Sequence, residues 1–85
     1  MEKDEVDNSR QMQERYSADL FPQKLGIELE SVRAGYARVS MVVAPDMHNF
    51  NGVTHGGALF TLADTAFGLA SNSRGTALAM HIHRF

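Results

Sequence analysis

The sequence predicts an α+β domain in which an antiparallel sheet wraps around one long apolar helix. Apolar and polar residues alternate in two neighbouring segments, 24–30 and 36–43, which is the period of half-buried strands. A third segment, 56–71, is apolar on nearly every side, as expected of a helix that other elements surround. Helices and antiparallel strands in this order are typical of the α+β class.

Composition limits the chain to one soluble domain. Its 85 residues are 44% hydrophobic, carry a formal net charge of −2 and include no cysteine. So short a chain buries only about 60–65% of its unfolded surface, and without disulfides we expect oligomerisation to supply the missing stability. The balanced charge gives no reason to expect nucleic acid or an anionic membrane as a partner. Because the first residues are polar and no apolar run reaches about 18 residues, neither a secretory signal nor a membrane span is predicted, and a cytoplasmic location is expected.

The chain is expected to comprise a flexible N-terminal segment, 1–9, followed by a single domain over 10–85. Asn8 or Ser9 is predicted to cap a short helix, and Pro22 to end it, since the residue before a proline avoids helical backbone angles. The apolar positions of this helix repeat every four residues, at Met12, Tyr16 and Leu20.

The two alternating segments are predicted to form an antiparallel hairpin with one apolar face. The turn falls at 33–35, where Gly35 is free to adopt a positive φ. Pro45 and Asp46 close the second strand. The inward-facing positions are Leu25, Ile27 and Leu29 in the first strand, and Ala37, Val39, Met41 and Val43 in the second.

The apolar helix is followed by another alternating segment, 76–85, which predicts a third strand. At about 100° per residue, one stripe of the helix carries small and polar residues, namely Gly57, Thr61, Asp64, Gly68 and Asn72. Gly75 is expected just past the end of the helix. Three strands cover such a helix poorly, so the chain is expected to be cut short.

Asp64 is the only carboxylate within the apolar helix, and no Lys or Arg lies within one turn of it. Burying an acid without a partner is costly, so this side chain is exposed to solvent, paired with another group, or used in the chemistry of a site. Partial desolvation would suit a general base working near neutral pH. The alternative is a carboxylate at the helix surface or one bonded to a neighbouring Thr, and the residues alone leave both open.

Gly56 and Gly57 begin the helix, where the first N–H groups lack partners within the helix and carry the positive end of its dipole. Without β-carbons they let a substrate oxygen approach closely, as is required of a donor to a carbonyl oxygen on which negative charge develops. The alternative is a tight turn with no ligand. Asn49 and Asn51 in the preceding loop are turn formers, and Thr65 has either the substrate or its own helix backbone as a partner.

The four histidines do not predict a metal site. His48 and His55 lie in the loop, and His81 and His83 share a strand face, but no Cys or suitably spaced Glu accompanies them. We therefore expect no metal and no cofactor. Arg38 and Arg84 are expected at solvated strand ends rather than on a bound phosphate.

A combined motif carries a family resemblance. It reads Asn49-x-x-Gly52-x-x-His55-Gly56-Gly57, followed by Leu62-Ala63-Asp64-x-Ala66-Phe67. Over about residues 20–83 the chain resembles the hotdog-fold acyl-CoA thioesterases of the phenylacetic-acid-degradation type. The resemblance implies a hotdog fold, with active sites at the interface of a homodimer or homotetramer.

The same resemblance implies a substrate and a role for each site residue. The substrate is an acyl-CoA, or an aryl-CoA such as phenylacetyl-CoA. Asp64 is the general base or nucleophile, the Gly56 N–H polarises the thioester carbonyl, and Asn49 holds the water or the carbonyl. His55 supports the turn. Residues expected to contact substrate are Gly57, Thr65 and Asn51.

Family members continue beyond the last residue of this chain, so a second hypothesis is a non-catalytic protein. It would bind acyl-CoA without hydrolysis, or would be an inactive truncated protein that only oligomerises. A dehydratase on the same fold is a weaker third hypothesis, because that activity calls for a different His/Asp loop. The identity of the acyl group is not predicted.

Overall fold

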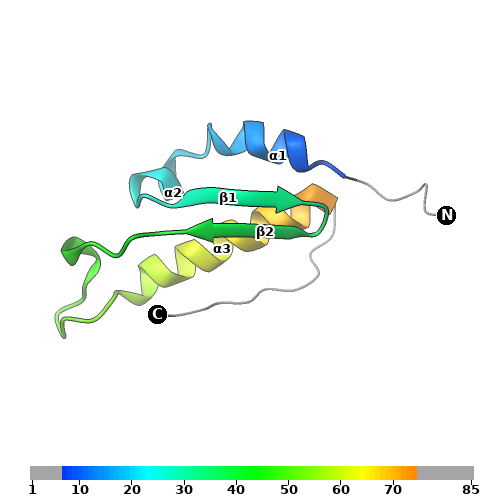
Figure 1. Ribbon diagram of the computed structural model, residues 1–85. Helices are drawn as coiled ribbons and strands as arrows, with labels where there is room; N and C mark the ends of the chain where they lie inside the picture. The colour runs from blue at the N-terminus through cyan, green and yellow to red at the C-terminus, as the bar shows by residue number, and fades with distance from the viewer. Residues whose placement is uncertain (1–6, 75–85) are drawn as a thin grey trace.

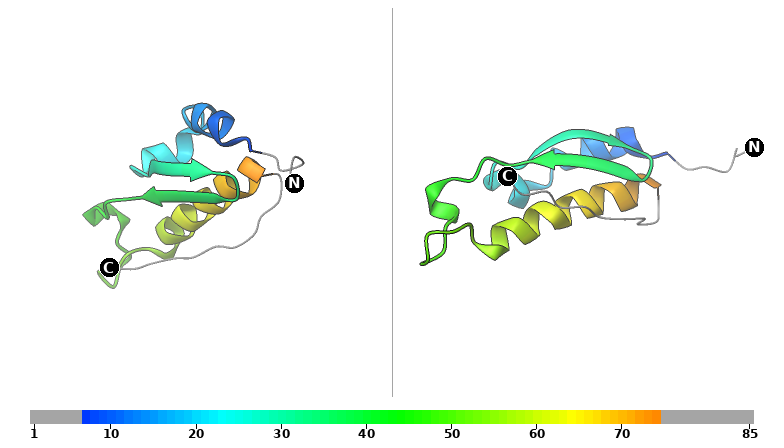
Figure 2. Two further views of the ribbon diagram at one scale, coloured as in Figure 1. Left: turned by 45° about the vertical axis from the view of Figure 1, so that its right-hand side comes forward. Right: turned by 60° about the horizontal axis from the view of Figure 1, so that its bottom comes forward.

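The computed structural model describes residues 7–74 as two helical segments, a β-hairpin, a loop and one long helix (Figure 1). The elements in order are α1 (Ser9–Tyr16), α2 (Leu20–Lys24), β1 (Glu28–Arg33), β2 (Tyr36–Ser40), the 3₁₀ turn η1 (Pro45–Met47) and α3 (Gly56–Arg74). The hairpin lies over α3 as a second layer, and α1 runs beside β1 (Figures 1 and 2). The predicted third strand, 76–85, Gly75 and most of the predicted flexible segment lie outside the described residues.

α1 begins as predicted but is capped and ended differently. Asn8 occupies the N-cap position without a side-chain cap bond, while the Asp7 carboxylate accepts the Ser9 N–H at 3.0 Å. Hydrogen bonds from Ser9 hold the pKa of Asp7 below its usual value. The prediction that Pro22 ends this helix is wrong: α1 ends at Tyr16, and Pro22 lies in the first turn of α2. A proline is tolerated there because first-turn N–H groups have no partner within the helix.

The hairpin has the predicted antiparallel pairing, with Arg33 opposite Tyr36 and Leu29 opposite Val39. Gly35 in the turn has a φ of 76°, as expected. The first strand starts later than predicted, because Gly26 also adopts a φ of 76° and the chain turns there before entering β1. The second strand ends at Ser40 rather than Val43.

The core lies where α1, the hairpin and α3 meet. Its buried members are Met12, Tyr16, Val32 and Leu69, with Leu29, Ala37 and Val39 packed against them. The inward-facing pattern predicted for the two strands is therefore correct for the part of each strand that the structure forms.

α3 runs three residues further than the predicted 56–71, to Arg74. The prediction that other elements surround it is wrong for the described part of the chain: Phe60 is 69% exposed and Phe67 36% exposed. Within residues 7–74, the two strands and α1 cover one side of the helix, and no described element covers the rest. None of the described helices is long and apolar enough to cross a membrane.

Candidate functional site

The loop before α3, residues 48–55, is stabilised by hydrogen bonds among its own residues and to Met47. His48 and Thr54 form an isolated antiparallel bridge, and the His55 N–H donates to the Met47 carbonyl at 2.6 Å. The Asn49 Oδ1 accepts the N–H groups of Asn51 at 2.8 Å and Val53 at 3.3 Å. The Asn49 oxygen therefore shapes the turn, as the turn-forming alternative describes. Asn51 itself is exposed.

His55 and the two glycines form the start of α3. The His55 Nδ1 accepts the Gly57 N–H at 3.0 Å, and the His55 carbonyl accepts those of Ala58 at 3.0 Å and Leu59 at 3.3 Å. Of the first four N–H groups of the helix, only that of Gly56 has no acceptor within residues 7–74. A Cβ built at Gly56 would meet nothing within 4 Å, whereas one at Gly57 would lie 3.3 Å from the His55 ring. The Gly56 N–H is therefore an accessible donor at the positive end of the helix dipole.

Asp64 lies two turns further along α3, and its side chain is exposed. Within residues 7–74 this carboxylate is therefore at the helix surface, the alternative to desolvation, because no described element packs directly onto its side chain. Thr65 is half-buried beside it, and its hydroxyl donates to the Thr61 carbonyl at 2.7 Å. Its partner is therefore its own helix backbone, the alternative to a substrate contact.

Asp64 borders an open hollow of about 670 Å³ between α3 on one side and α1 and α2 on the other. We call this the α1–α3 hollow. Its lining from α3 comprises Phe60, Thr61, Asp64, Thr65, Gly68, Leu69 and Asn72. Its lining from the N-terminal elements comprises Met12, Arg15, Tyr16, Ala18, Asp19, Phe21 and Pro22. Of the stripe of small and polar residues predicted along α3, all but Gly57 therefore line this hollow.

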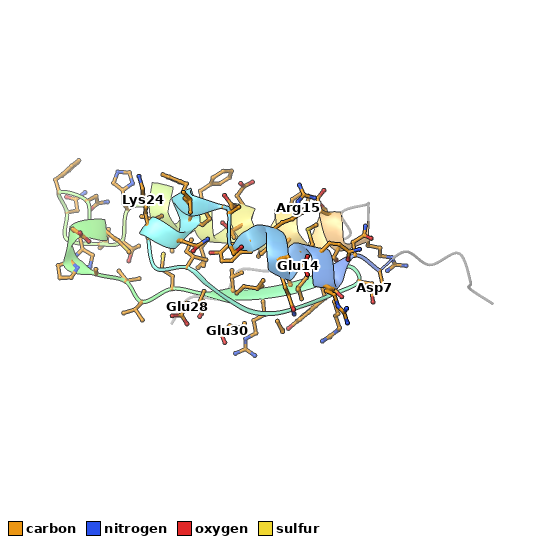
Figure 3. All side chains as sticks on the ribbon, turned by 90° about the horizontal axis from the view of Figure 1, so that it is seen from above. Asp7, Glu14, Arg15, Lys24, Glu28 and Glu30 are labelled. Carbon is orange, nitrogen blue, oxygen red and sulfur yellow. The ribbon has the colours of Figure 1, made fainter. Side chains whose placement is uncertain are left out.

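The aromatic and basic residues of this hollow were not predicted from the sequence. Phe60 lies four residues before Asp64, so helical spacing was a signal for it. Nothing in the sequence indicated that Phe21 and Arg15 face α3, since they lie more than 30 residues before it along the chain. Figure 3 shows Arg15 on the opposite side of the molecule from Glu28 and Glu30.

The start of α3 and Asp64 are far apart within one chain. Gly56 and Asp64 are separated by eight residues, which is about 12 Å along a helix at about 1.5 Å per residue. A donor to a carbonyl oxygen and a base acting at the same carbon must each lie about 3 Å from their targets. One chain therefore cannot apply both groups to the same carbonyl group.

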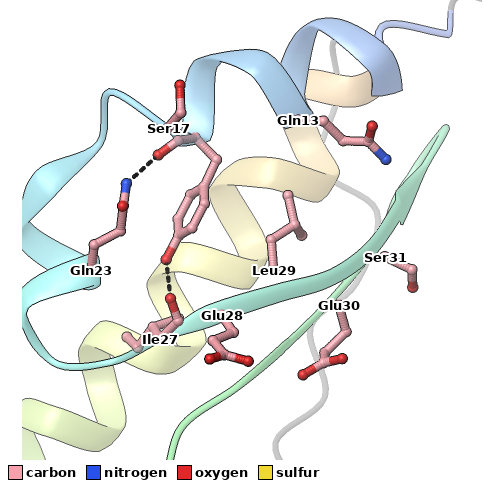
Figure 4. A pocket seen from close by; sticks show the side chains of 9 residues that line it. Gln13, Ser17, Gln23, Ile27, Glu28, Leu29, Glu30 and Ser31 are labelled. Atoms are coloured by element: carbon pink, nitrogen blue, oxygen red, sulfur yellow. Dashed lines mark hydrogen bonds between the residues drawn. The ribbon is translucent and has the colours of Figure 1, made fainter.

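A second open hollow of about 540 Å³ lies between α1 and the start of β1 (Figure 4). The Tyr16 hydroxyl donates to the Ile27 carbonyl at 2.6 Å beside it, and the Gln23 side chain donates to the Tyr16 carbonyl at 2.6 Å. Burial raises the pKa of Tyr16, and the charges of Asp19 and Glu28 raise it further. None of the site residues predicted from the sequence borders this hollow.

Among the residues that the structure covers, no three His, Asp or Glu side chains group as metal ligands would. His81, His83 and Arg84 fall outside this part of the chain. Arg38 is exposed on β2, the solvated position expected for it.

Comparison with known proteins identifies the class. Residues 20–81 match the family described as "Domain of unknown function (DUF4442)", and the chain belongs to this family. The acyl-coenzyme A thioesterase PaaI of Escherichia coli strain K12 is 47% identical over 62 residues, which are 73% of this chain and 44% of that protein. This chain thus spans less than half the length of that relative.

Solved structures show the fold. The E. coli PaaI protein from the phenylacetic acid degradation operon aligns with a TM-score of 0.75 and 36% identity, over 88% of this chain and 62% of that one. A conserved protein from Pseudomonas aeruginosa aligns with a TM-score of 0.62 and 38% identity, over 66% of this chain and 45% of that one. The predicted α+β hotdog fold and the resemblance to hotdog thioesterases are confirmed.

Proposed function

We propose that this protein is an acyl-CoA thioesterase, which hydrolyses an acyl- or aryl-CoA to the free acid and CoA. The observation that carries the proposal is the arrangement of α3. Within residues 7–74 the Gly56 N–H at its start has no acceptor and a Cβ built at Gly56 would meet nothing within 4 Å, and Asp64 borders a hollow two turns later. The 47% identity to the E. coli acyl-coenzyme A thioesterase PaaI supports assigning this arrangement to thioester chemistry.

In the proposed reaction, the thioester oxygen accepts a hydrogen bond from the Gly56 N–H, whose dipole stabilises the charge that develops on that oxygen. Asp64 acts as the base that takes a proton from the attacking water, or as the nucleophile itself. When Asp64 acts as the base, CoA leaves as the thiolate and takes up the proton that Asp64 accepted from the water. When Asp64 is the nucleophile, the C–S bond breaks as a mixed anhydride forms, and water then hydrolyses this anhydride to the free acid and the Asp64 carboxylate. The proposed chemistry requires neither metal nor cofactor.

Because one chain cannot apply both groups to one carbonyl, the proposal requires two copies. The Gly56 corner of one copy faces Asp64 of the other, in a homodimer or in a homotetramer built from such dimers. The exposed Phe60 and Phe67 on α3 offer apolar surface for such an association. A partner there would also supply the desolvation that Asp64 lacks in the single chain. The proposal includes a cytoplasmic location, in keeping with a chain free of cysteine.

Replacing Asp64 with Asn tests the proposal, because Asn keeps the shape of the side chain and removes its basicity. We expect turnover of acyl-CoA, followed by release of free thiol, to fall by about 10²- to 10⁴-fold. Circular dichroism and thermal unfolding should match the wild-type protein, since the side chain is exposed. Unchanged turnover in Asp64→Asn would remove this residue from the mechanism.

A second candidate function is acyl-CoA binding without hydrolysis. It is favoured by the exposure of the Asp64 side chain within residues 7–74. Thiol release separates the two candidates, with size-exclusion chromatography on the same sample. Binding of acyl-CoA without thiol release would support the second candidate.

A further inference from the structure

We infer that Thr65 is a catalytic residue of the proposed reaction, because its hydroxyl oxygen accepts one hydrogen bond of the attacking water while Asp64 accepts the other. The water is thereby held with a lone pair directed at the thioester carbon. This inference rests on the proposed function and adds to it the group that orients the nucleophile. Of the two roles open to Asp64, it assigns that of general base.

Four polar side chains of α3 line the α1–α3 hollow, and three of them bond back to their own helix. Each donates to the carbonyl four residues earlier: Thr61 to Gly57 at 2.8 Å, Thr65 to Thr61 at 2.7 Å, and Asn72 to Gly68 at 2.8 Å. Asp64 is the fourth, and a carboxylate has no proton to donate. Neither threonine hydroxyl has a proton left for it, so within residues 7–74 Asp64 is not bonded to a neighbouring Thr.

The bond to the Thr61 carbonyl determines what Thr65 offers to the hollow. A hydroxyl group has one proton and two acceptor lone pairs. Because the proton of Thr65 lies on the Thr61 carbonyl, the oxygen presents only acceptor capacity to the hollow. The same bond fixes the rotamer of this β-branched side chain. The Thr65 oxygen is therefore in place before any substrate binds.

Asp64 and Thr65 together form a pair of acceptors, which suits a ligand with two protons to donate. They are consecutive residues, and both border the α1–α3 hollow. A water in the hollow donates one proton to the carboxylate and the other to the hydroxyl oxygen, over about 2.8 Å each. Its lone pairs then point away from α3. The acyl carbon must lie on that side, about 3–3.5 Å from the water oxygen.

The protons of the reaction balance without ionisation of Thr65. As the water oxygen bonds to the acyl carbon, Asp64 takes the proton that points at it. The C–S bond then breaks, and this proton passes to the departing sulfur of CoA. The second proton of the water stays on the acid that forms. Thr65 only accepts a hydrogen bond, and its own proton remains on the Thr61 carbonyl.

Thr61 provides a matched comparison for Thr65. Both residues are half-buried threonines that line the hollow and bond to the carbonyl four residues earlier. The Thr61 bond is exposed to solvent, however, whereas the Thr65 bond is partly buried. An exposed hydroxyl exchanges its water freely with the solvent, while a partly buried one keeps a single water in one orientation. We therefore assign the water to Thr65.

Replacing each threonine with Val tests this assignment, because Val keeps the β-branched shape and removes the hydroxyl. We expect Thr65→Val to lower kcat by about 10- to 100-fold and to change KM little, because a misplaced nucleophile slows the chemical step. Thr65→Ser restores the hydroxyl and should recover most of kcat. Thr61→Val loses the same kind of helix bond and should change kcat little. Equal losses of kcat in the two Val variants would show that the helix bond matters rather than the water, and would overturn the inference.

A crystal structure of the wild-type protein gives a readout that needs no turnover. A water should lie within about 3.2 Å of both the Thr65 Oγ1 and the Asp64 carboxylate, and it should be missing from Thr65→Val. If this water is present but the wild-type protein releases no thiol, the thioesterase proposal fails and the water site stands. If the protein releases thiol, but the water is absent or Thr65→Val keeps the wild-type kcat, the inference is refuted and the thioesterase stands.

Discussion

Ser73 shows how one small side chain fixes α3 against the hairpin. It is fully buried, and its Oγ accepts the Gly35 N–H at 3.0 Å. The same oxygen lies 3.0 Å from the Arg33 carbonyl and 2.8 Å from the Ala70 carbonyl, which accept its proton. The tip of the hairpin is thereby tied to the last turn of the helix, and this in turn orients the face of α3 that carries Asp64.

Replacing Ser73 with Ala should destabilise the fold by about 1–3 kcal/mol, because a backbone N–H and a carbonyl in the turn lose their partner. The free energy of unfolding, measured with urea, checks this value. Ser71→Ala is the control: Ser71 is only half-buried, and its hydroxyl lies 3.5 Å from the Gly68 carbonyl. Equal losses in the two variants would contradict a special role for Ser73.

Ionisation of the Tyr16 phenol should make the free energy of unfolding depend on pH in the alkaline range. Its pKa is raised in the folded protein, first by burial and then by Asp19 and Glu28. In the unfolded chain the phenol loses its proton near its ordinary pKa of about 10, while the folded protein still retains it. The unfolded state then binds fewer protons, so the free energy of unfolding falls as the pH rises above about 9.

Urea unfolding between pH 8 and 11 measures this dependence. Tyr16→Phe should flatten the fall, and at neutral pH it should cost about 1 kcal/mol, because the hydrogen bond to the Ile27 carbonyl is lost. A variant that is as sensitive to alkali as the wild-type protein would show that other groups cause the effect.

At the scale of elements, two substitutions at the start of α3 distinguish an effect on folding from an effect on the proposed catalysis. Gly56 is the first helical residue, a position where proline is tolerated because its missing N–H has no partner within the helix. Gly56→Pro removes the proposed oxyanion donor, whereas Gly56→Ala keeps it and places its Cβ in open space.

We expect Gly56→Pro to lower kcat by about 10²- to 10³-fold while the protein remains folded. Gly56→Ala should lose far less activity, and its thermal stability should equal or slightly exceed that of the wild type. Thiol release and thermal unfolding of the two proteins give the comparison. A proline variant as active as the alanine variant would exclude the Gly56 N–H as the donor.

The elements that the sequence predicts well are those whose signal is local. The hairpin follows from an alternation of period two around Gly35, and α3 follows from its long apolar run. The start of β1 was predicted too early, because the positive φ at Gly26 depends on the turn that joins β1 to α2. The end of α1 was misplaced because a proline such as Pro22 fits either just past the end of a helix or in its first turn. The α1–α3 hollow could not be predicted, because periodicity does not tell which faces of distant helices meet. The roles of Asp64 and Gly56 stay predictions that came from the motif.

At the scale of the whole molecule, the arrangement of α3 leaves the proposed active site incomplete within a single chain. The eight residues between Gly56 and Asp64 keep the two groups about 12 Å apart, and Phe60 and Phe67 stay exposed beside them. In the proposed two-fold dimer the Gly56 corner of each copy would meet Asp64 of the other, so each site would take one group from each chain.

This composite site predicts that two inactive variants restore activity when they are mixed. In a heterodimer of Asp64→Asn and Gly56→Pro chains, one site contains both substitutions and the other contains neither. Unfolding and refolding an equal mixture gives heterodimers as half of all dimers, so thiol release should recover to about one quarter of the wild-type value. Each variant refolded alone should stay at its low level, which is the control. If the mixture stays as inactive as its components, while size-exclusion chromatography shows dimers, then both groups act within one chain and the composite site is wrong.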